Sequence, residues 1–284
     1  MNDTDFQILG RLFQHPLDGP QAIAREVGLT RNAVSRRIRL LEASPVHLMF
    51  FALPHQDLFG RESVVNLYMA PGDVDERAVW ASGDILAFDQ NHDGLVAVTT
   101  WTKHGTHPEG LDHALGGAPI AQYHDVAPGP EAPYLSRLEW RVLRALMHDP
   151  RASNAKLARD TGLAARTCAR ARERLVTSNA IRLGINIYED HSNGFPIYRL
   201  YVQGGFSRNA VAALLGPDTV ISDTVAEGCV YFAKAPSLGA IMATVERVKA
   251  HDGVDDVKLI LSTQNRVNWA WIDRLILQQL EAKS

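Results

Sequence analysis

The sequence predicts an α+β protein made of two copies of one unit, in which three helices precede a βαββαβ sandwich. Three observations predict this organisation. The two halves of the chain repeat one another at a constant offset, each half begins with a three-helix pattern, and each continues as short apolar runs that alternate with amphipathic segments. The 284 residues are enough for several compact units with hydrophobic cores of their own.

The repeat has a fixed offset of 134 residues and holds its register without a gap from residue 5 to residue 94. A register kept over so long a stretch indicates a duplicated unit, since chance similarity is confined to short windows. The pairs of like residues include Asp5 with Glu139, Leu12 with Leu146, Pro16 with Pro150, Gly28 with Gly162, Arg36 with Arg170 and Gly94 with Gly228.

The three helices of the first copy follow from apolar spacing and from residues that begin or end helices. Apolar side chains three and four residues apart mark a helix around 8–13. A second helix over 21–27 ends at Gly28, which suits a left-handed turn, and Thr30 is a good N-cap for a third helix that reaches Leu41. The second copy repeats the pattern over 140–147, 154–161 and 164–176.

A small residue, a glycine and an apolar residue have the spacing of a helix-turn-helix in each copy. They are Ala24, Gly28 and Val34 in the first copy and Ala158, Gly162 and Cys168 in the second. Cys168 is therefore interpreted as a small core residue, and a reactive thiol is the alternative. Its only companion in the sequence is Cys229, so neither a disulfide framework nor a metal site of the usual spacing is expected.

Short apolar runs at 46–53 and 181–188 predict a wing strand after each helix-turn-helix. The segments that follow have the order βαββαβ in both copies. In the first copy they are 63–69, 75–81, 85–89, 95–101, 108–115 and 120–123, and in the second 197–203, 207–215, 219–223, 229–234, 238–250 and 257–262. An amphipathic segment at 269–283 predicts a closing helix.

Composition places the domain boundaries, because the stretch 127–134 is rich in proline and predicts a linker. Before it we expect a winged helix-turn-helix over 1–45 and a ferredoxin-like sandwich over 46–126. After it we expect a second winged helix-turn-helix over 135–183 and a second sandwich, with the closing helix, over 184–284.

Charge is unevenly distributed along the chain, whose net charge is −3. Residues 135–183 hold eleven basic and four acidic residues, whereas 1–45 hold six and five, and 46–134 hold three and twelve. A positive block in an acidic protein indicates a surface that meets a polyanion, and a solvated Arg-rich face is the alternative. Without an apolar run of about 18 residues, and with acids near the N-terminus, we expect a cytoplasmic protein.

The third helices and the strands after them resemble the Lrp/AsnC family, the leucine-responsive or feast-famine transcriptional regulators. The residues are LTRNAVSRRIRLLEA at 29–43 and LAARTCARARERLVTS at 163–178, two Arg-rich helices that run directly into a strand. Typical members carry one such unit and dimerise, whereas this chain carries two. The resemblance implies a sequence-specific regulator that binds double-stranded DNA, pairs its sandwiches within one chain and forms homo-oligomers. No cofactor and no catalytic residue are expected.

The residues expected to contact DNA lie off the apolar stripes of the third helices, where Arg can pair with guanine or with phosphates. They are Thr30, Arg31, Asn32, Ser35, Arg36 and Arg39 in the first copy and Arg166, Thr167, Arg170 and Arg174 in the second. The more positive second unit is expected to carry more of the phosphate binding.

Members of the family often bind an amino acid or another small molecule near the loop between the second and third strands. The matching residues here are Asn91, Asp93, Gly94, Glu227 and Gly228, and neither segment has the family's Gly-Asp-x-Asp pattern. They are the candidate effector site. The alternative is that Asp-Gly and Glu-Gly simply form tight turns between antiparallel strands.

Siroheme decarboxylases share this architecture and use His and Arg residues near a tetrapyrrole, so they are the alternative function. One stretch of the chain holds His104, His107, His113 and His124, but the second copy has no histidines at the matching positions. The retained basic third helices favour the regulator. The sequence therefore predicts that the chain is not an enzyme.

Overall fold

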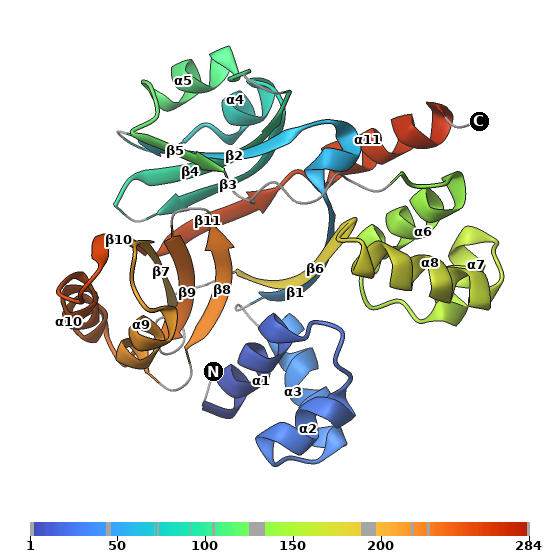
Figure 1. Ribbon diagram of the computed structural model, residues 1–284, viewed down its shortest axis with the longest axis horizontal. Helices are drawn as coiled ribbons and strands as arrows, with labels where there is room; N and C mark the ends of the chain where they lie inside the picture. The colour runs from blue at the N-terminus through green and yellow to red at the C-terminus, as the bar shows by residue number, and fades with distance from the viewer. Residues whose placement is uncertain are drawn as a thin grey trace.

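The computed structural model describes residues 3–43, 47–70, 72, 74–91, 93–103, 106–124, 134–188, 197–216, 219–225 and 228–282. Two three-helix domains and two sandwiches surround a central two-stranded ribbon (Figure 1). The α+β class predicted from the sequence is confirmed, and in both halves three helices, one strand and a βαββαβ arrangement follow in the same order.

The first three-helix domain consists of α1 (Asp3–Gln14), α2 (Pro20–Val27) and α3 (Arg31–Ala43). Gly28 ends α2 in the left-handed conformation, with φ of 68°, and its N–H donates to the Ala24 carbonyl. The Thr30 hydroxyl accepts a hydrogen bond from the Ala33 N–H at 3.2 Å. The predicted turn and the predicted N-cap are therefore both present.

The second three-helix domain consists of α6 (Arg137–His148), α7 (Asn154–Thr161) and α8 (Ala165–Thr177). Ser136 and Glu139 form a reciprocal capping box at the start of α6. Cys168 is fully buried in the stripe that α8 turns toward α6 and α7. Its interpretation as a core residue is confirmed.

Each sandwich has two helices on the outer face of a four-strand βαββαβ arrangement (Figure 1). The strand orders, β3-β4-β2-β5 and β8-β9-β7-β10, correspond position by position, as a duplication requires. The first sandwich contains β2 (Glu62–Met69), α4 (Glu76–Ala81), β3 (Ile85–Asn91), β4 (Leu95–Thr102), α5 (Glu109–Leu115) and β5 (Ala121–His124). The second contains β7 (Ile197–Gly204), α9 (Arg208–Leu215), β8 (Val220–Val225), β9 (Gly228–Lys234), α10 (Leu238–Lys249) and β10 (Val254–Ile260).

The strands expected to form two wings pair with each other instead. β1 (His47–Pro54) and β6 (Ile181–Tyr188) form an antiparallel ribbon in which His47 lies opposite Tyr188. Both strands are rich in apolar residues, and the ribbon lets them bury those side chains between the halves. The sequence located both strands but gave no indication that they pair with each other across the two halves.

Two elements were not expected from the sequence: the short helix η1 (Gln56–Phe59) and the strand β11 (Ser262–Val267). β11 leaves the second half and pairs antiparallel with β3, so that it becomes the fifth strand of the first sheet. It leads directly into α11 (Trp269–Ala282), which packs on α6.

Each three-helix domain packs on the sandwich of the opposite half. Phe6 and Phe13 of α1 contact Phe232 of β9, with ring centroids 5.6 and 4.7 Å apart respectively. On the other side, Trp140 of α6 lies in one hydrophobic cluster with Trp101 of β4. The two halves are therefore interlocked through buried apolar contacts.

Candidate functional site

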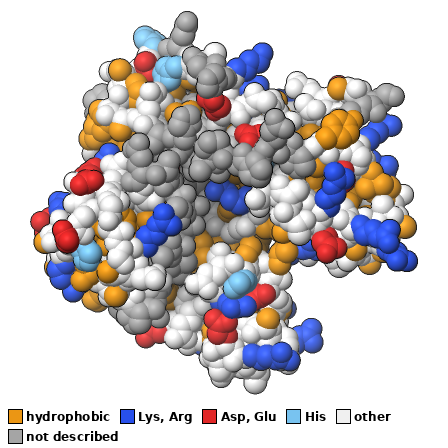
Figure 2. All heavy atoms as spheres, viewed as in Figure 1, with side chains coloured by type: hydrophobic (Ala, Val, Ile, Leu, Met, Phe, Trp, Pro, Cys, Tyr) orange, Lys and Arg blue, Asp and Glu red, His pale blue; other side chains and the backbone are white. Residues whose placement is uncertain are grey.

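The outer face of α3 carries a row of polar side chains opposite its buried stripe of Val34, Ile38 and Leu41. Figure 2 shows Lys and Arg side chains gathered on the surfaces of both three-helix domains. A helix that presents guanidinium groups on a protruding face can enter the major groove of DNA. The predicted residues Thr30, Arg31, Asn32, Arg36 and Arg39 are exposed, and Ser35 is half-buried.

The outer face of α8 has a similar row but a different distribution of free guanidinium groups. Arg166 and Arg170 are exposed, and Thr167 is half-buried. Arg174 is engaged within the fold: its Nη1 lies 2.7 Å from Glu139 Oε1 of the capping box. The structure thus sets Arg174 apart from the other predicted residues, because its guanidinium group joins α8 to α6.

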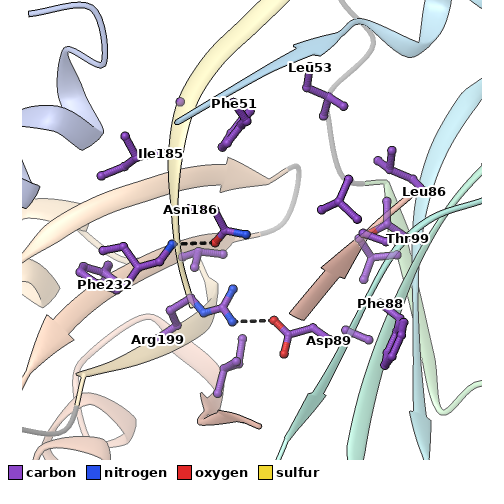
Figure 3. Close-up of a pocket in the computed structure, with 18 of the residues that line it drawn as sticks. Phe51, Leu53, Leu86, Phe88, Asp89, Thr99, Ile185, Asn186, Arg199 and Phe232 are labelled. Atoms are coloured by element: carbon purple, nitrogen blue, oxygen red, sulfur yellow. Dashed lines mark hydrogen bonds and ion pairs between the residues drawn. The ribbon is translucent and has the colours of Figure 1, made fainter. Parts of the chain in front are cut away.

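A central cavity of about 340 Å³ lies between the inner faces of the two sheets and beside the β1–β6 ribbon (Figure 3). Most of its lining is apolar, which is typical of a small-molecule site. Side chains from both halves meet here, including Phe51, Leu67, Phe88, Ile185, Val230 and Phe232.

Charged groups of opposite sign meet across the cavity. Arg199 of β7 points toward Asp89 of β3, and its Nη2 lies 2.5 Å from the Asp89 carboxylate (Figure 3). Arg182 contacts the face of Phe51, at 5.9 Å from the ring centroid, and Lys258 adds a third basic group. Arg199 is paired with Asp89, and Lys258 Nζ lies 3.7 Å from Asp256, so the three basic groups are partly neutralised. Guanidinium and ammonium groups of this kind suit a ligand that carries a carboxylate.

Asn91 is the polar residue that marks the cavity most clearly. It is 4% exposed, and within the described part of the chain its Oδ1 has no hydrogen-bond partner. A buried amide oxygen without a partner costs free energy, so this atom is available to a ligand donor. Of the four predicted effector residues that the structure describes, Asn91 is the one that lines the cavity.

Asp93, Gly94 and Gly228, the other described effector candidates, do not line the cavity. The exposed Asp93 accepts the Leu95 N–H at 3.0 Å, and Gly94 has φ of 82°, so both form the hairpin turn that was the alternative interpretation. Gly228 is needed because a Cβ there would lie 2.4 Å from the Val202 carbonyl oxygen. Glu227 lies outside the described residues. The loop pattern could not indicate Arg182, Arg199 or Lys258, which come from three different strands of the second half, β6, β7 and β10.

Two of the histidines that motivated the enzyme alternative have described side chains, His107 and His113, and neither lines the cavity. His107 contacts Asp112 at 2.8 Å, and Asp112 accepts a hydrogen bond from the Tyr68 hydroxyl at 2.9 Å. The His107 contact lowers the pKa of Asp112, while burial raises the pKa of Tyr68. This group lies on the helix-covered side of the first sheet, and His113 is exposed. His104 and the side chain of His124 lie outside what is described.

The described residues contain no group of three or more His, Cys, Asp or Glu side chains placed to hold a metal ion. Within the same ranges, no helix combines the length and apolar character that a membrane crossing needs.

Both three-helix domains match the AsnC-type helix-turn-helix domain family, at residues 1–42 and 135–176. No curated protein matches the chain. Among solved structures, the siroheme decarboxylase NirDL is similar over 98% of this chain and 99% of its own, with 13% identity and a TM-score of 0.50. AsnC from E. coli covers 48% of this chain, with 96% of its own length, 16% identity and a TM-score of 0.31. A Neisseria meningitidis transcriptional regulator, solved as an L-Met complex, covers 48% of this chain with 95% of its own length, 18% identity and a TM-score of 0.33.

The full-length likeness corrects one expectation. The sequence predicted that the chain is not an enzyme, yet the architecture that it shares from end to end is that of an enzyme. The scaffold therefore gives no ground for excluding catalysis. The predicted resemblance to the Lrp/AsnC family is confirmed in both halves, and this chain is a tandem protein with two AsnC-type helix-turn-helix domains.

Proposed function

We propose that this chain is a DNA-binding transcriptional regulator of the Lrp/AsnC type, in which α3 and α8 read double-stranded DNA. The observation that carries the proposal is the exposed row of guanidinium groups on the third helix of each matched domain. Arg36 and Arg170 hold equivalent positions in the two rows and are the first candidates for contacts to guanine. The different neighbours, Asn32 and Arg166, favour two half-sites of unequal sequence.

The proposal is tested by selecting duplexes from a random-sequence pool on the full chain and measuring their affinity by fluorescence anisotropy. We expect enrichment of one sequence and a steep decrease in affinity with salt, because bound phosphates release counterions. Arg77→Ala, at an exposed residue of α4 away from both domains, is the matched control and should leave affinity unchanged. Failure to enrich any sequence, together with no binding at 50 mM salt, would refute the proposal.

The central cavity is the proposed effector site. Its ligand is an apolar molecule with a carboxylate and a hydrogen-bond donor, a description that fits an amino acid. The carboxylate would meet Arg182 or Lys258, and the donor would meet Asn91 Oδ1. Because the β1–β6 ribbon lines the cavity and leads to both helix-turn-helix domains, a ligand there can change their relative position.

Thermal denaturation in the presence of each of the twenty amino acids tests this site. A ligand at 100 times its dissociation constant should add about 2.7 kcal/mol to the free energy of unfolding. The stabilisation should vanish in Asn91→Leu and persist in Asp93→Ala, whose side chain forms the turn. Loss of the stabilisation in Asp93→Ala but not in Asn91→Leu would instead place the ligand at the hairpin turn.

A second candidate function is a tetrapyrrole enzyme similar to siroheme decarboxylase, favoured by the likeness over both full chains. Arg182, Arg199 and Lys258 could bind the carboxylates of such a substrate. The cavity, however, is near the lower end of small-molecule sites, and its described lining has no histidine or cysteine to ligate iron. A visible spectrum recorded after addition of siroheme separates the two candidates: a shifted Soret band, lost in Lys258→Ala, supports the enzyme.

We also propose that whole chains assemble further into homo-oligomers. The expected result in light scattering at micromolar concentration is a mass of at least two chains, and a strict monomer would contradict it.

A further inference from the structure

Arg151 belongs to the second helix-turn-helix domain but lies against the first. It follows α6, in the loop before α7, and its guanidinium carbon is 4.4 Å from the centroid of the Phe50 ring of β1. Its Nη2 donates to the Asp18 carbonyl oxygen, in the loop before α2, at 3.1 Å. Stacking and one hydrogen bond therefore fix the plane of this guanidinium group and leave its other N–H groups for a further acceptor.

Arg151 also lines a hollow of about 540 Å³ on the surface of the first domain. One side of the hollow is α3, with Arg31 and Arg39, and another is Pro20 at the N-terminus of α2. Three guanidinium groups from two domains thus surround one concavity, together with Asn32, Ser35, Ile38 and the carboxylate of Glu42. The nearby Asp18 carboxylate is already neutralised by Arg11, at 2.6 Å.

The chemistry of this hollow is that of an anion site. Guanidinium groups pair with phosphate through parallel N–H···O bonds, and the amino end of a helix adds a partial positive charge. The first turn of α2 contains no acidic residue that would cancel that charge. The hollow also adjoins the face of α3 that carries Asn32 and Arg36, so an anion held there would flank a duplex lying on that face.

We propose that this hollow binds one backbone phosphate of DNA, and that Arg151 of the second domain completes the DNA site of the first. The inference rests on the proposed DNA binding and adds a DNA-contacting residue that comparison of the two copies would not reveal. The residue equivalent to Arg151 in the first copy is Leu17, which is 42% exposed. Arg31 and Arg39 correspond to Ala165 and Glu173 on α8, so none of the three guanidinium groups has a counterpart in the other copy, and the phosphate site belongs to one half of the protein.

The test is the salt dependence of binding to a random-sequence 30-base-pair duplex, measured by anisotropy between 50 and 200 mM salt. Arg151→Leu, which introduces the residue of the other copy, should lower the slope of log affinity against log salt by about one. Arg39→Leu should have the same effect, and Arg77→Leu should have none. The double variant Arg39→Leu/Arg151→Leu should lose no more than Arg151→Leu if both residues hold one phosphate.

The outcomes distinguish this inference from the function on which it rests. No binding by the unmodified protein refutes DNA binding itself. Binding with an unchanged slope in Arg151→Leu refutes the phosphate contact, even if affinity falls, because loosened packing on Phe50 would change affinity but not the number of counterions released. Arg151→Lys keeps the charge and should keep the slope. Stabilisation of the unmodified protein by inorganic phosphate, with no effect of Arg151→Leu on the DNA slope, would assign the hollow to free phosphate and overturn the proposal.

Discussion

Arg144 and Asp273 form a two-pronged ion pair that joins α6 to α11. Nε lies 2.7 Å from Oδ1 and Nη2 lies 2.9 Å from Oδ2, while His148 approaches the same carboxylate at 3.2 Å. This pair is the polar part of the contact by which the last helix of the chain holds the second helix-turn-helix domain. Its apolar part includes Ile272 and Ile276, both fully buried.

Asp273→Asn should lower the free energy of unfolding by about 1 kcal/mol at pH 7, a modest value because Arg144 is 38% exposed and solvent screens the pair. The hydrogen bond from Arg144 lowers the pKa of Asp273. The pair therefore stabilises the fold above the unfolded-state pKa, near 4, and this contribution is lost as pH falls through the lower folded-state pKa. Urea titrations at pH 7 and pH 3 check both points. Asp160→Asn, at the exposed pair with Lys156, is the control and should change little.

Arg170→Ala should weaken DNA binding by roughly 1–3 kcal/mol, and Arg36→Ala should weaken it less. The reason is the excess of basic residues in 135–183 over 1–45, which makes the second domain the stronger electrostatic anchor. Gel-shift titrations of the two variants side by side measure the difference. Equal losses would show that the charge imbalance does not govern the contribution of each helix.

Phe232→Ala should loosen the first helix-turn-helix domain from the second sandwich. The ring is 2% exposed and contacts both Phe6 and Phe13, so its removal leaves a cavity and should cost about 3–5 kcal/mol. Relative to the unmodified protein, the variant should show a larger increase in amide hydrogen exchange in α1 than in α6. Phe232→Leu, which keeps most of the volume, should cost distinctly less, and equal costs would argue against a packing role.

Asn91→Leu should leave the free energy of unfolding unchanged or raise it by up to about 1 kcal/mol, because it removes a buried oxygen that lacks a partner in the described structure. Asn66→Leu is the matched control. Asn66 is also buried, but its side chain bonds to Thr100 and Gln122, so its loss should cost about 1–3 kcal/mol. If both variants were equally destabilised, Asn91 would have a structural partner, and the cavity would lose its strongest polar feature.

Cys168 and Cys229 should resist alkylation by a thiol reagent in the folded protein. Both are fully buried, and access to the sulfur atoms requires unfolding. Mass spectrometry with and without urea measures the difference. Rapid labelling of Cys168 in the absence of denaturant would revive its interpretation as a reactive thiol.

Local elements were predictable wherever the residues themselves dictate them. The helix Asn154–Thr161 and the strand Ile181–Tyr188 have the bounds that the sequence predicted, since capping residues and β-branched runs act over a few neighbours. β11 was missed because Gln264, Asn265 and Arg266 give it no apolar alternation. It is a strand because β3 offers an unpaired edge, and an edge far along the chain leaves no mark on the local sequence.

In the candidate site, too, features that depend on local sequence were predictable and features that depend on distant contacts were not. The exposed arginines of α3 and α8 follow from helical periodicity, and most of the predicted DNA contacts are exposed as expected. The residues that line the cavity and the position of Arg151 could not be predicted from helical periodicity, because both depend on contacts between the two halves. Arg199 meets Asp89, and Arg151 meets Phe50, across more than 100 residues of sequence. The sequence singled out Asn91 because it lies beside a loop, whereas the structure shows that it lines the central cavity with a buried side-chain oxygen.

The crossing of β11 into the first sheet also limits how this protein can evolve. The strand β11 completes the sheet of the first half, and α11 packs both on α6 and on the cluster around Trp101, so the two copies can no longer be inherited, lost or exchanged as separate modules. Separating the two copies into different chains would remove β11 from the edge of β3 and expose the apolar surface around Trp101. A second molecule would then have to supply β11 and α11. A covalent connection thus replaces what a single-unit protein must obtain by finding another copy of itself, and each half can diverge in sequence while its partner is guaranteed.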